Sequence, residues 1–201
     1  MRILFIIITS FFVTQCTMFY TGERPVISKA LITKSEAVVG YELIGWNGSV
    51  DRNKAKHILS AFVSANRFRQ FRHKESIDSD FNIQLILEAS PKFQFFMGEN
   101  HEPVSWLAER DEKRYVVYLI NRLLSLRTFF VVPDINRDDD YLLVRVMKKG
   151  KIFREYRYDI ESYNFFGWLS LLAFPFDDRP NQSKIYNQII YKFLEDSKDV
   201  F

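Results

Sequence analysis

Residues 141–160 have the sequence YLLVRVMKKGKIFREYRYDI and predict the β-hairpin around which the fold is organised. Residues 141–147 and 152–160 are rich in aromatic and β-branched side chains, which favour strands. The turn between them, Lys148-Lys149-Gly150-Lys151, is polar and contains a glycine, which supplies the positive φ that a tight turn requires. We therefore expect two antiparallel strands here, with the remaining strands added beside them.

Three further segments predict strands. Residues 36–46 are rich in strand-forming residues and end at the turn sequence Asn47-Gly48. Residues 81–88 alternate apolar and polar side chains except at Ile86, as a strand with one mostly polar face does. Residues 129–135, FFVVPDI, also have strand character, and Pro133 places this strand at an edge or an end.

Three segments have apolar residues at helical spacing, and they complete the fold prediction. Residues 52–66 follow Asp51, a residue type that caps helices, residues 104–126 carry one apolar stripe, and residues 184–194 carry a wide apolar face. Four of their side chains are expected to face one shared core: Leu59, Phe62, Leu123 and Phe193. The order β-α-β-α-β-β-β-α predicts an α+β fold, a two-layer domain with a largely antiparallel sheet and helices packed on one face.

The composition of the 201 residues is that of a folded protein. Apolar residues make up 47% and charged residues 26%, which excludes disordered, collagen-like and low-complexity classes. The net charge is +3 and the isoelectric point is near 8.9, with the two signs interspersed along the chain. Bulk electrostatics therefore identifies no polyanionic partner.

The N-terminus is typical of an export signal. Arg2 is the only charged residue before Glu23, and residues 3–13, ILFIIITSFFV, are almost entirely apolar. As a helix this run would span about 16 Å, at roughly 1.5 Å per residue, which is half the hydrocarbon thickness of a bilayer. The run therefore suits a cleaved leader better than a membrane-spanning helix.

The four residues after this run, Val13-Thr14-Gln15-Cys16, resemble a bacterial lipobox of the relaxed, spirochaetal type. The resemblance implies that Cys16 becomes the first mature residue, that it is acylated, and that the protein is held outside the cytoplasm on the cell envelope. Thr17 follows the cysteine, and common sorting rules for lipoproteins then imply the outer rather than the inner membrane. The alternative is an uncleaved anchor over residues 3–20. With one cysteine in the chain, no internal disulfide can form.

These observations divide the chain into three parts. Residues 1–15 are the predicted signal peptide. Residues 16–35 sustain no periodicity and are expected to form a lipidated tether. Residues 36–201 are expected to form a single α+β domain.

Residues 67–74, RFRQFRHK, interleave cations with aromatic rings. The candidate ligands for an anionic polymer or headgroup are its four cations: Arg67, Arg69, Arg72 and Lys74. The alternative is a helix end with solvated arginines whose Phe68 and Phe71 pack inward. Because an exported domain rarely meets nucleic acid, no nucleic-acid partner is predicted.

Residues 163–176, YNFFGWLSLLAFPF, contain no charged side chain. The segment is too short to span a bilayer, but its rings are of the type found at membrane interfaces. The candidates for contact with a membrane or a partner protein are Phe165, Phe166, Trp168 and Leu169. The alternative, a buried strand or short helix, is favoured because apolar runs of this length usually belong to a core.

Catalytic and metal-binding motifs are not recognisable in the sequence. Residues 134–140, DINRDDD, have the oxygen spacing of half a calcium loop, but Asp139 and Arg145 stand where the loop needs glycine and glutamate. His101 lacks the second histidine of a zinc helix, and no serine lies in a nucleophile elbow. We therefore expect no cofactor, no metal and no catalytic residues.

The sequence thus predicts a bacterial cell-envelope lipoprotein whose domain is a non-catalytic binding or scaffolding module at the membrane surface. Its expected partners are the membrane, through the N-terminal lipid, and an envelope protein or anionic polymer. Two alternatives stay open. One is an extracytoplasmic hydrolase, and the other is an uncleaved membrane-anchored accessory subunit that docks through residues 163–176.

Overall fold

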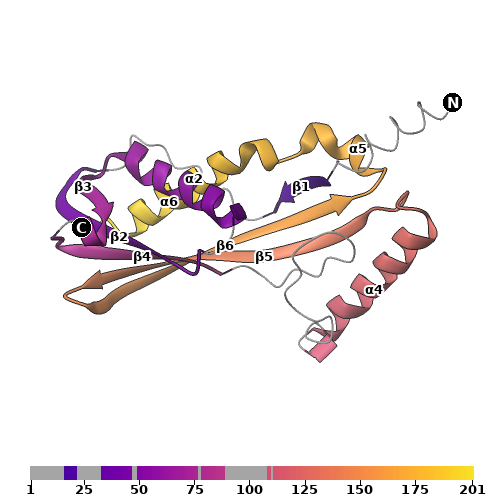
Figure 1. The fold of residues 1–201 in the computed structure, drawn as a ribbon, viewed down its shortest axis with the longest axis horizontal. Coiled ribbons are helices and arrows are strands. Elements are labelled where there is room, and N and C mark those ends of the chain that lie inside the picture. Colours follow the sequence, from indigo (N-terminus) through magenta and orange to yellow (C-terminus); the bar gives the residue numbers. More distant parts are fainter. Residues whose placement is uncertain (1–15, 22–32, 47–48, 77, 89–107, 110) are drawn as a thin grey trace. The chain divides into compact units, whose positions relative to one another are not determined.

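The computed structural model describes residues 16–21, 33–46, 49–76, 78–88, 108–109 and 111–201 (Figure 1). Six strands form a mixed open sheet in the order β1-β6-β5-β4-β2-β3. With its helices this sheet confirms the α+β fold. The strands are β1 (Cys16–Tyr20), β2 (Ser35–Ile44), β3 (Phe68–His73), β4 (Phe81–Glu88), β5 (Asp134–Lys148) and β6 (Lys151–Phe166). The helices are α2 (Ser49–Ala65), α4 (Glu112–Arg127), α5 (Ser170–Ala173) and α6 (Gln182–Asp196), with short 3-10 turns η2 (Lys74–Ser76), η3 (Phe174–Phe176) and η4 (Arg179–Asn181).

The strand directions follow from the connections. β2 is parallel to both β3 and β4, because α2 carries the chain back before β3 begins. β4 is antiparallel to β5, and β1 is antiparallel to β6. β5 and β6 form the hairpin that the sequence predicts, and its turn residues Lys149 and Gly150 have φ of 52° and 75°. Positive φ at both central residues is the requirement of a type I′ turn.

The chain divides into two compact units, and the single domain predicted for residues 36–201 stays a prediction. In unit 1 the described elements are β1, α4, β5 as far as Asp139, β6 from Glu161, α5 and η3. In unit 2 they are β2, α2, β3, η2, β4, α6 and the remaining parts of β5 and β6. The two long hairpin strands therefore belong to both units.

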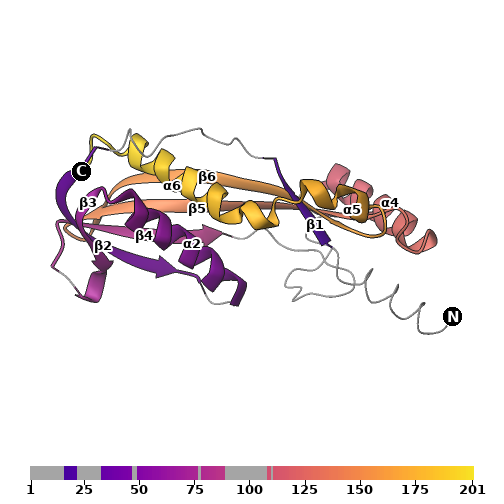
Figure 2. The same ribbon diagram turned by 90° about the horizontal axis from the view of Figure 1, so that it is seen from above.

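Unit 2 has a closed hydrophobic core. Its two helices, α2 and α6, pack against each other over one face of its strands (Figure 2). The ring of Phe62 on α2 meets the ring of Phe193 on α6 edge to face, at 5.8 Å between centroids. Alternate residues of the strands complete the core: Val39, Ile83, Leu85, Leu142, Val144 and Val146. These positions match the predicted helical and strand periodicities.

The predicted shared core is wrong for one of its four members. Phe62 and Phe193 are buried and Leu59 is half-buried, all in unit 2. Leu123 instead lies on α4 in unit 1 with 67% of its surface exposed. The apolar stripe of α4 was identified correctly, but it does not face a core within the described residues. Residues 104–107, the predicted start of this helix, lie outside the described residues.

Two segments have a different secondary structure from the one predicted. Residues 128–132 form a turn, not a strand, and Phe129 and Phe130 have positive φ of 49° and 61°. Thr128 caps the preceding helix, since its N–H donates a hydrogen bond to the Leu124 carbonyl. Strand β5 begins only after Pro133. Cys16–Tyr20, expected in the tether, forms strand β1 and pairs with β6. The rest of the expected tether is described only at Thr21 and from residue 33 onward.

Candidate docking surface

Helix α4 of unit 1 presents its apolar side outward. Its buried residues are Arg122 and Ser125, both polar. Every exposed residue between positions 115 and 126 is apolar: Val116, Val117, Leu119, Ile120, Leu123, Leu124 and Leu126. This is the reverse of a surface helix in a globular protein, which turns its apolar stripe inward. The inversion needs two explanations, one for what holds the polar side and one for what covers the apolar side.

The polar side of α4 is held by the start of β5. The Asn121 side chain donates to the Pro133 carbonyl at 2.9 Å and accepts from the Ile135 N–H at 2.9 Å. Arg122 forms an ion pair with Asp134 and donates to the Asn136 side chain at 2.7 Å. Burial lowers the pKa of the Arg122 guanidinium, but arginine remains charged in proteins. A buried charge needs such a partner, so the orientation of the helix is fixed by its polar residues.

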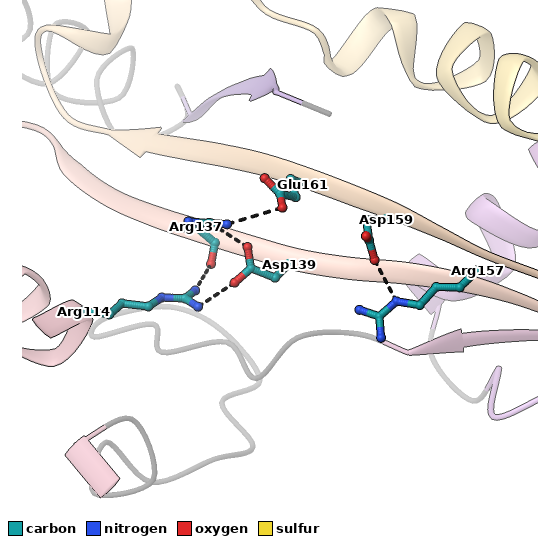
Figure 3. A network of polar contacts seen from close by, with 6 residues as sticks. All are labelled: Arg114, Arg137, Asp139, Arg157, Asp159 and Glu161. Atoms are coloured by element: carbon teal, nitrogen blue, oxygen red, sulfur yellow. Dashed lines mark hydrogen bonds and ion pairs between the residues drawn. The ribbon is translucent and has the colours of Figure 1, made fainter. Parts of the chain in front are cut away.

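A second polar network holds the N-terminal turn of α4 (Figure 3). Arg114 donates to the Asp139 carboxylate at 2.5 Å and to the Arg137 carbonyl at 2.8 Å. The Arg137 guanidinium donates to the other oxygen of Asp139 at 2.6 Å and lies 3.4 Å from Glu161 on β6. The hydrogen bond to Asp139 raises the pKa of Arg137, and nearby Tyr163 and Glu161 act in the same direction. The helix is therefore fixed to the strands at both ends of its polar side.

Strand β1 is fixed on both of its edges. One edge pairs with β6, where Cys16 lies opposite Phe166. Along the other edge, the Met18 N–H donates to the Asp177 carboxylate and the Tyr20 N–H donates to the Asp178 carboxylate, both at 3.0 Å. These carboxylates occupy donors that an edge strand would otherwise expose to other chains. Cys16 is therefore the first residue of a strand that is bound on two sides.

The turn after α4 packs against the end of β6. The Trp168 N–H donates to the Phe130 carbonyl at 2.8 Å, and the rings of Phe130 and Phe166 meet edge to face at 5.5 Å. Between them, Gly167 has φ of 150°, and a Cβ there would lie 2.6 Å from the Phe130 oxygen. This close approach requires glycine. Because Phe166 is paired with Cys16, the turn, the end of β6 and the start of β1 lie together (Figure 1).

Five large apolar side chains after Gly167 in segment 163–176 are exposed, so the interpretation of this segment as core is wrong for them. Trp168 is 47% exposed, and Leu169, Leu172, Phe174 and Phe176 are exposed as well. Phe165 and Phe166 are half-buried at the end of β6. The physical reason is that Gly167 ends the strand and the chain continues as single turns, α5 and η3, which are too short to bury a face of their own.

A small apolar pocket lies beside these turns. Its volume is about 390 Å³, and its lining comes from β1, the end of β6, the turn before α5, α5 itself and the residue before β5: Phe19, Pro133, Phe165, Leu169, Ser170 and Ala173. The rings of Phe19 and Phe165 meet edge to face at 5.2 Å. The pocket has no charged lining residue, so it is suited to an apolar group and not to a polar substrate.

We give the name apolar surface to three groups of exposed apolar residues in unit 1. They are the seven residues of α4 named above, Phe129 and Val131 of the turn, and Trp168, Leu169, Leu172, Phe174 and Phe176 after β6. The sequence identified the third group in part, through Trp168 and Leu169. It missed α4 and Phe129, which is 84% exposed. Large exposed apolar patches mark contact sites for proteins or membranes.

The four predicted anion-binding residues lie in unit 2, but the structure does not present them as one group. Arg67 is only 4% exposed and donates to the Leu194 and Ser197 carbonyls at the end of α6, so it is not available to an external anion. Arg69 and Arg72 are exposed on β3, which is a strand and not a helix end. Lys74 forms an ion pair with Glu42 at 2.5 Å, and this hydrogen bond lowers the pKa of Glu42.

The aromatic residues of the same segment pack inward, as the alternative interpretation predicts. Phe68 is buried, and the Phe71 ring stacks on Phe62 at 4.8 Å.

The aspartates of the calcium-like sequence have protein partners. Asp134 pairs with Arg122, Asp138 accepts from the Asn164 side chain at 2.7 Å, and Asp140 pairs with Lys54 at 3.0 Å. Among the described residues, no three His, Cys, Asp or Glu side chains are grouped as a metal ion would need. In the same part of the chain, no helix has the length and hydropathy to cross a membrane.

Comparisons with known proteins give only distant structural likenesses. The chain matches no protein-family model and no curated protein. It is similar to a putative neuraminyllactose-binding hemagglutinin homolog from Helicobacter pylori, with 11% identity, a TM-score of 0.41, and 88% of this chain and 90% of that chain covered. It is also similar to the PelC dodecamer from Paraburkholderia phytofirmans, with 8% identity, a TM-score of 0.29, and coverage of 88% and 96%. At these values neither likeness bears on function.

Proposed function

We propose that this protein is a lipid-anchored, non-catalytic binding module of the bacterial cell envelope that docks through unit 1. The observation that carries the proposal is the apolar surface. Its exposed side chains belong to elements that are fixed by buried polar contacts, such as the Arg122 and Asp134 pair. A surface that is both apolar and rigidly held is what a docking function requires, because little ordering cost is added on contact.

The position of Cys16 supports the anchor. If Cys16 is acylated, the lipid is attached to the first residue of β1, with no flexible tether between lipid and sheet. Each acyl CH₂ transferred into a bilayer contributes about 0.8 kcal/mol, so two or three chains would hold the protein stably. Cys16 pairs with Phe166 of β6, and Phe166 is followed directly by Gly167 and the exposed Trp168. The anchor and the docking residues are therefore neighbours.

A second candidate function is supported by the exposed side chains of residues 163–176. An uncleaved, membrane-anchored accessory subunit would also dock through residues 163–176. The two proposals differ at Cys16, because only the lipoprotein requires cleavage before this residue and acylation on it.

Metabolic labelling with a fatty acid separates the two. We expect label and a processed product in the parent chain and in Thr17→Ser, a conservative control at the next residue. Cys16→Ser should lose the label and accumulate the longer precursor. Equal labelling of parent and Cys16→Ser contradicts lipidation, and an unprocessed, unlabelled parent supports the accessory subunit.

A further inference from the structure

The apolar surface lies on two opposite sides of the strands. Phe165 and Phe166 are consecutive in β6, so their side chains point to opposite faces. Phe165 lines the pocket beside α5, whereas Phe166 contacts Phe130 in the turn that follows α4. Figure 1 shows α4 and α5 on either side of the hairpin strands. One flat protein interface cannot cover both faces at once.

The apolar side of α4 is also wide. At 100° per residue its exposed apolar residues cover an arc of about 180°, from Leu126 and Leu119 on one flank to Val117 on the other. A single partner helix covers the narrower seam formed by two heptad positions, and such seams are flanked by charges. Here the exposed side carries charges only at its ends: Glu112 and Lys113 in the first turn and Arg127 in the last.

This arrangement is suited to a lipid phase, which surrounds whatever is inserted into it. Cations at the ends of an apolar helix can extend to the headgroups while the apolar residues between them are immersed. We propose that the apolar surface of unit 1, with α4 on one side and α5 and η3 on the other, is immersed in the interface of the bilayer that holds the acylated Cys16. The proposal names the partner of the surface and rests on the proposed function for the anchor beside it.

The test uses the full chain, processed by a bacterial host, purified from membranes and reconstituted into vesicles. The vesicles contain phosphatidylethanolamine, phosphatidylglycerol and phosphatidylcholine, the last either plain or brominated on its acyl chains. Bromine quenches a tryptophan that it contacts. Leu123→Trp places a reporter on α4 at a position 67% exposed, and Val63→Trp places the matched control on α2 of unit 2 at a position 66% exposed. Both substitutions are at surface positions, so both variants should fold.

We expect brominated lipid to remove the added emission of Leu123→Trp and to leave that of Val63→Trp unchanged. The parent chain has three tryptophans, Trp46, Trp106 and Trp168. Trp168→Phe should reduce the quenching of the parent by brominated lipid, because the exposed Trp168 belongs to the apolar surface. Equal emission from Leu123→Trp in plain and brominated vesicles overturns the proposal.

Fatty-acid labelling of the same samples keeps the two proposals apart. Label without quenching at Leu123→Trp supports the lipid anchor and overturns immersion; a protein partner that covers this surface would give this result. Quenching without label supports immersion and overturns the lipidation of Cys16. Loss of both overturns both proposals.

Discussion

Replacing Phe193 with alanine should remove one of the two largest fully buried side chains from the core of unit 2. The Phe193 side chain has no exposed surface. Its ring meets three others, those of Tyr156 at 5.3 Å, Phe62 at 5.8 Å and Phe201 at 6.4 Å between centroids. These rings come from α2, β6 and the C-terminus, so they cannot easily close the space that the substitution leaves.

The expected cost can be worked from this environment. Truncation of a buried phenylalanine to alanine costs about 3–5 kcal/mol, through lost transfer free energy and the cavity left behind. Edge-to-face ring pairs contribute about 0.5–1.5 kcal/mol beyond buried area. Because Phe193 makes three such contacts, we expect Phe193→Ala to fall in the upper half of the first range.

Leu123→Ala is the matched control. Leu123 is also a large apolar residue on a helix, but two-thirds of it is exposed, so its truncation should change the free energy of unfolding by less than about 0.5 kcal/mol. The assay is urea unfolding of the full chain in detergent micelles, followed by circular dichroism and by tryptophan emission. Trp46 reports on unit 2, because its indole donates to the Leu85 carbonyl at 2.8 Å.

The difference between the two variants is the quantity that checks the structure. Similar costs for Phe193→Ala and Leu123→Ala, at either end of the scale, would refute the division into a closed core in unit 2 and an open apolar helix in unit 1. A cost for Phe193→Ala below about 1 kcal/mol would refute the ring cluster itself.

Three further substitutions test other contacts. Gly167→Ala should cost more than Gly45→Ala. Both positions have a positive φ, which costs a non-glycine residue on the order of 1–3 kcal/mol, but only at Gly167 would the added Cβ also meet backbone atoms. Equal melting temperatures of the two variants would contradict this. Asp178→Ala should cost about 1.5–3 kcal/mol by leaving a β1 N–H without its charged acceptor, as measured by urea unfolding, with unchanged stability as the contrary result. The hydrogen bond with Lys74 lowers the pKa of Glu42, so the ion pair stabilises the fold above the ordinary pKa of 4.5 and this stabilisation is lost as the pH falls through the lower folded pKa. Glu42→Gln should therefore be less stable than the parent at pH 7 and equally stable in acid. A stability difference that does not change with pH would contradict the ion pair.

The parts of the fold that were predictable from sequence are those in which periodicity and burial agree. In β4, Ile83, Leu85 and Leu87 are buried as the alternation indicates, and Ile86, which interrupts the alternation, is buried as well. In α6, the predicted wide face is the buried face. The hairpin turn was marked by the chemistry of Gly150. In both elements one side faces a core, which is the condition that pattern analysis assumes.

Other features depend on contacts that no local pattern encodes. The parallel pairing of β2 with β3 and β4 is a choice among distant partners. The burial of Arg67 is set by carbonyls at the end of α6, more than a hundred residues away. The turn at 128–132 has apolar, β-branched residues typical of a strand, but a helix cap and Pro133 determine its conformation.

The inverted orientation of α4 could have been inferred from charge, although it was not. Residues 115–126 contain one charged side chain, Arg122, and no lysine, glutamate or aspartate. A face exposed to water normally carries several such residues, so a helix without them has no side suited to solvent. Its apolar stripe and its polar stripe must then both be covered, and the polar one is covered by partners for Asn121 and Arg122. No partner for the apolar side is found among the described residues, which leaves that side open to the bilayer contact that we propose.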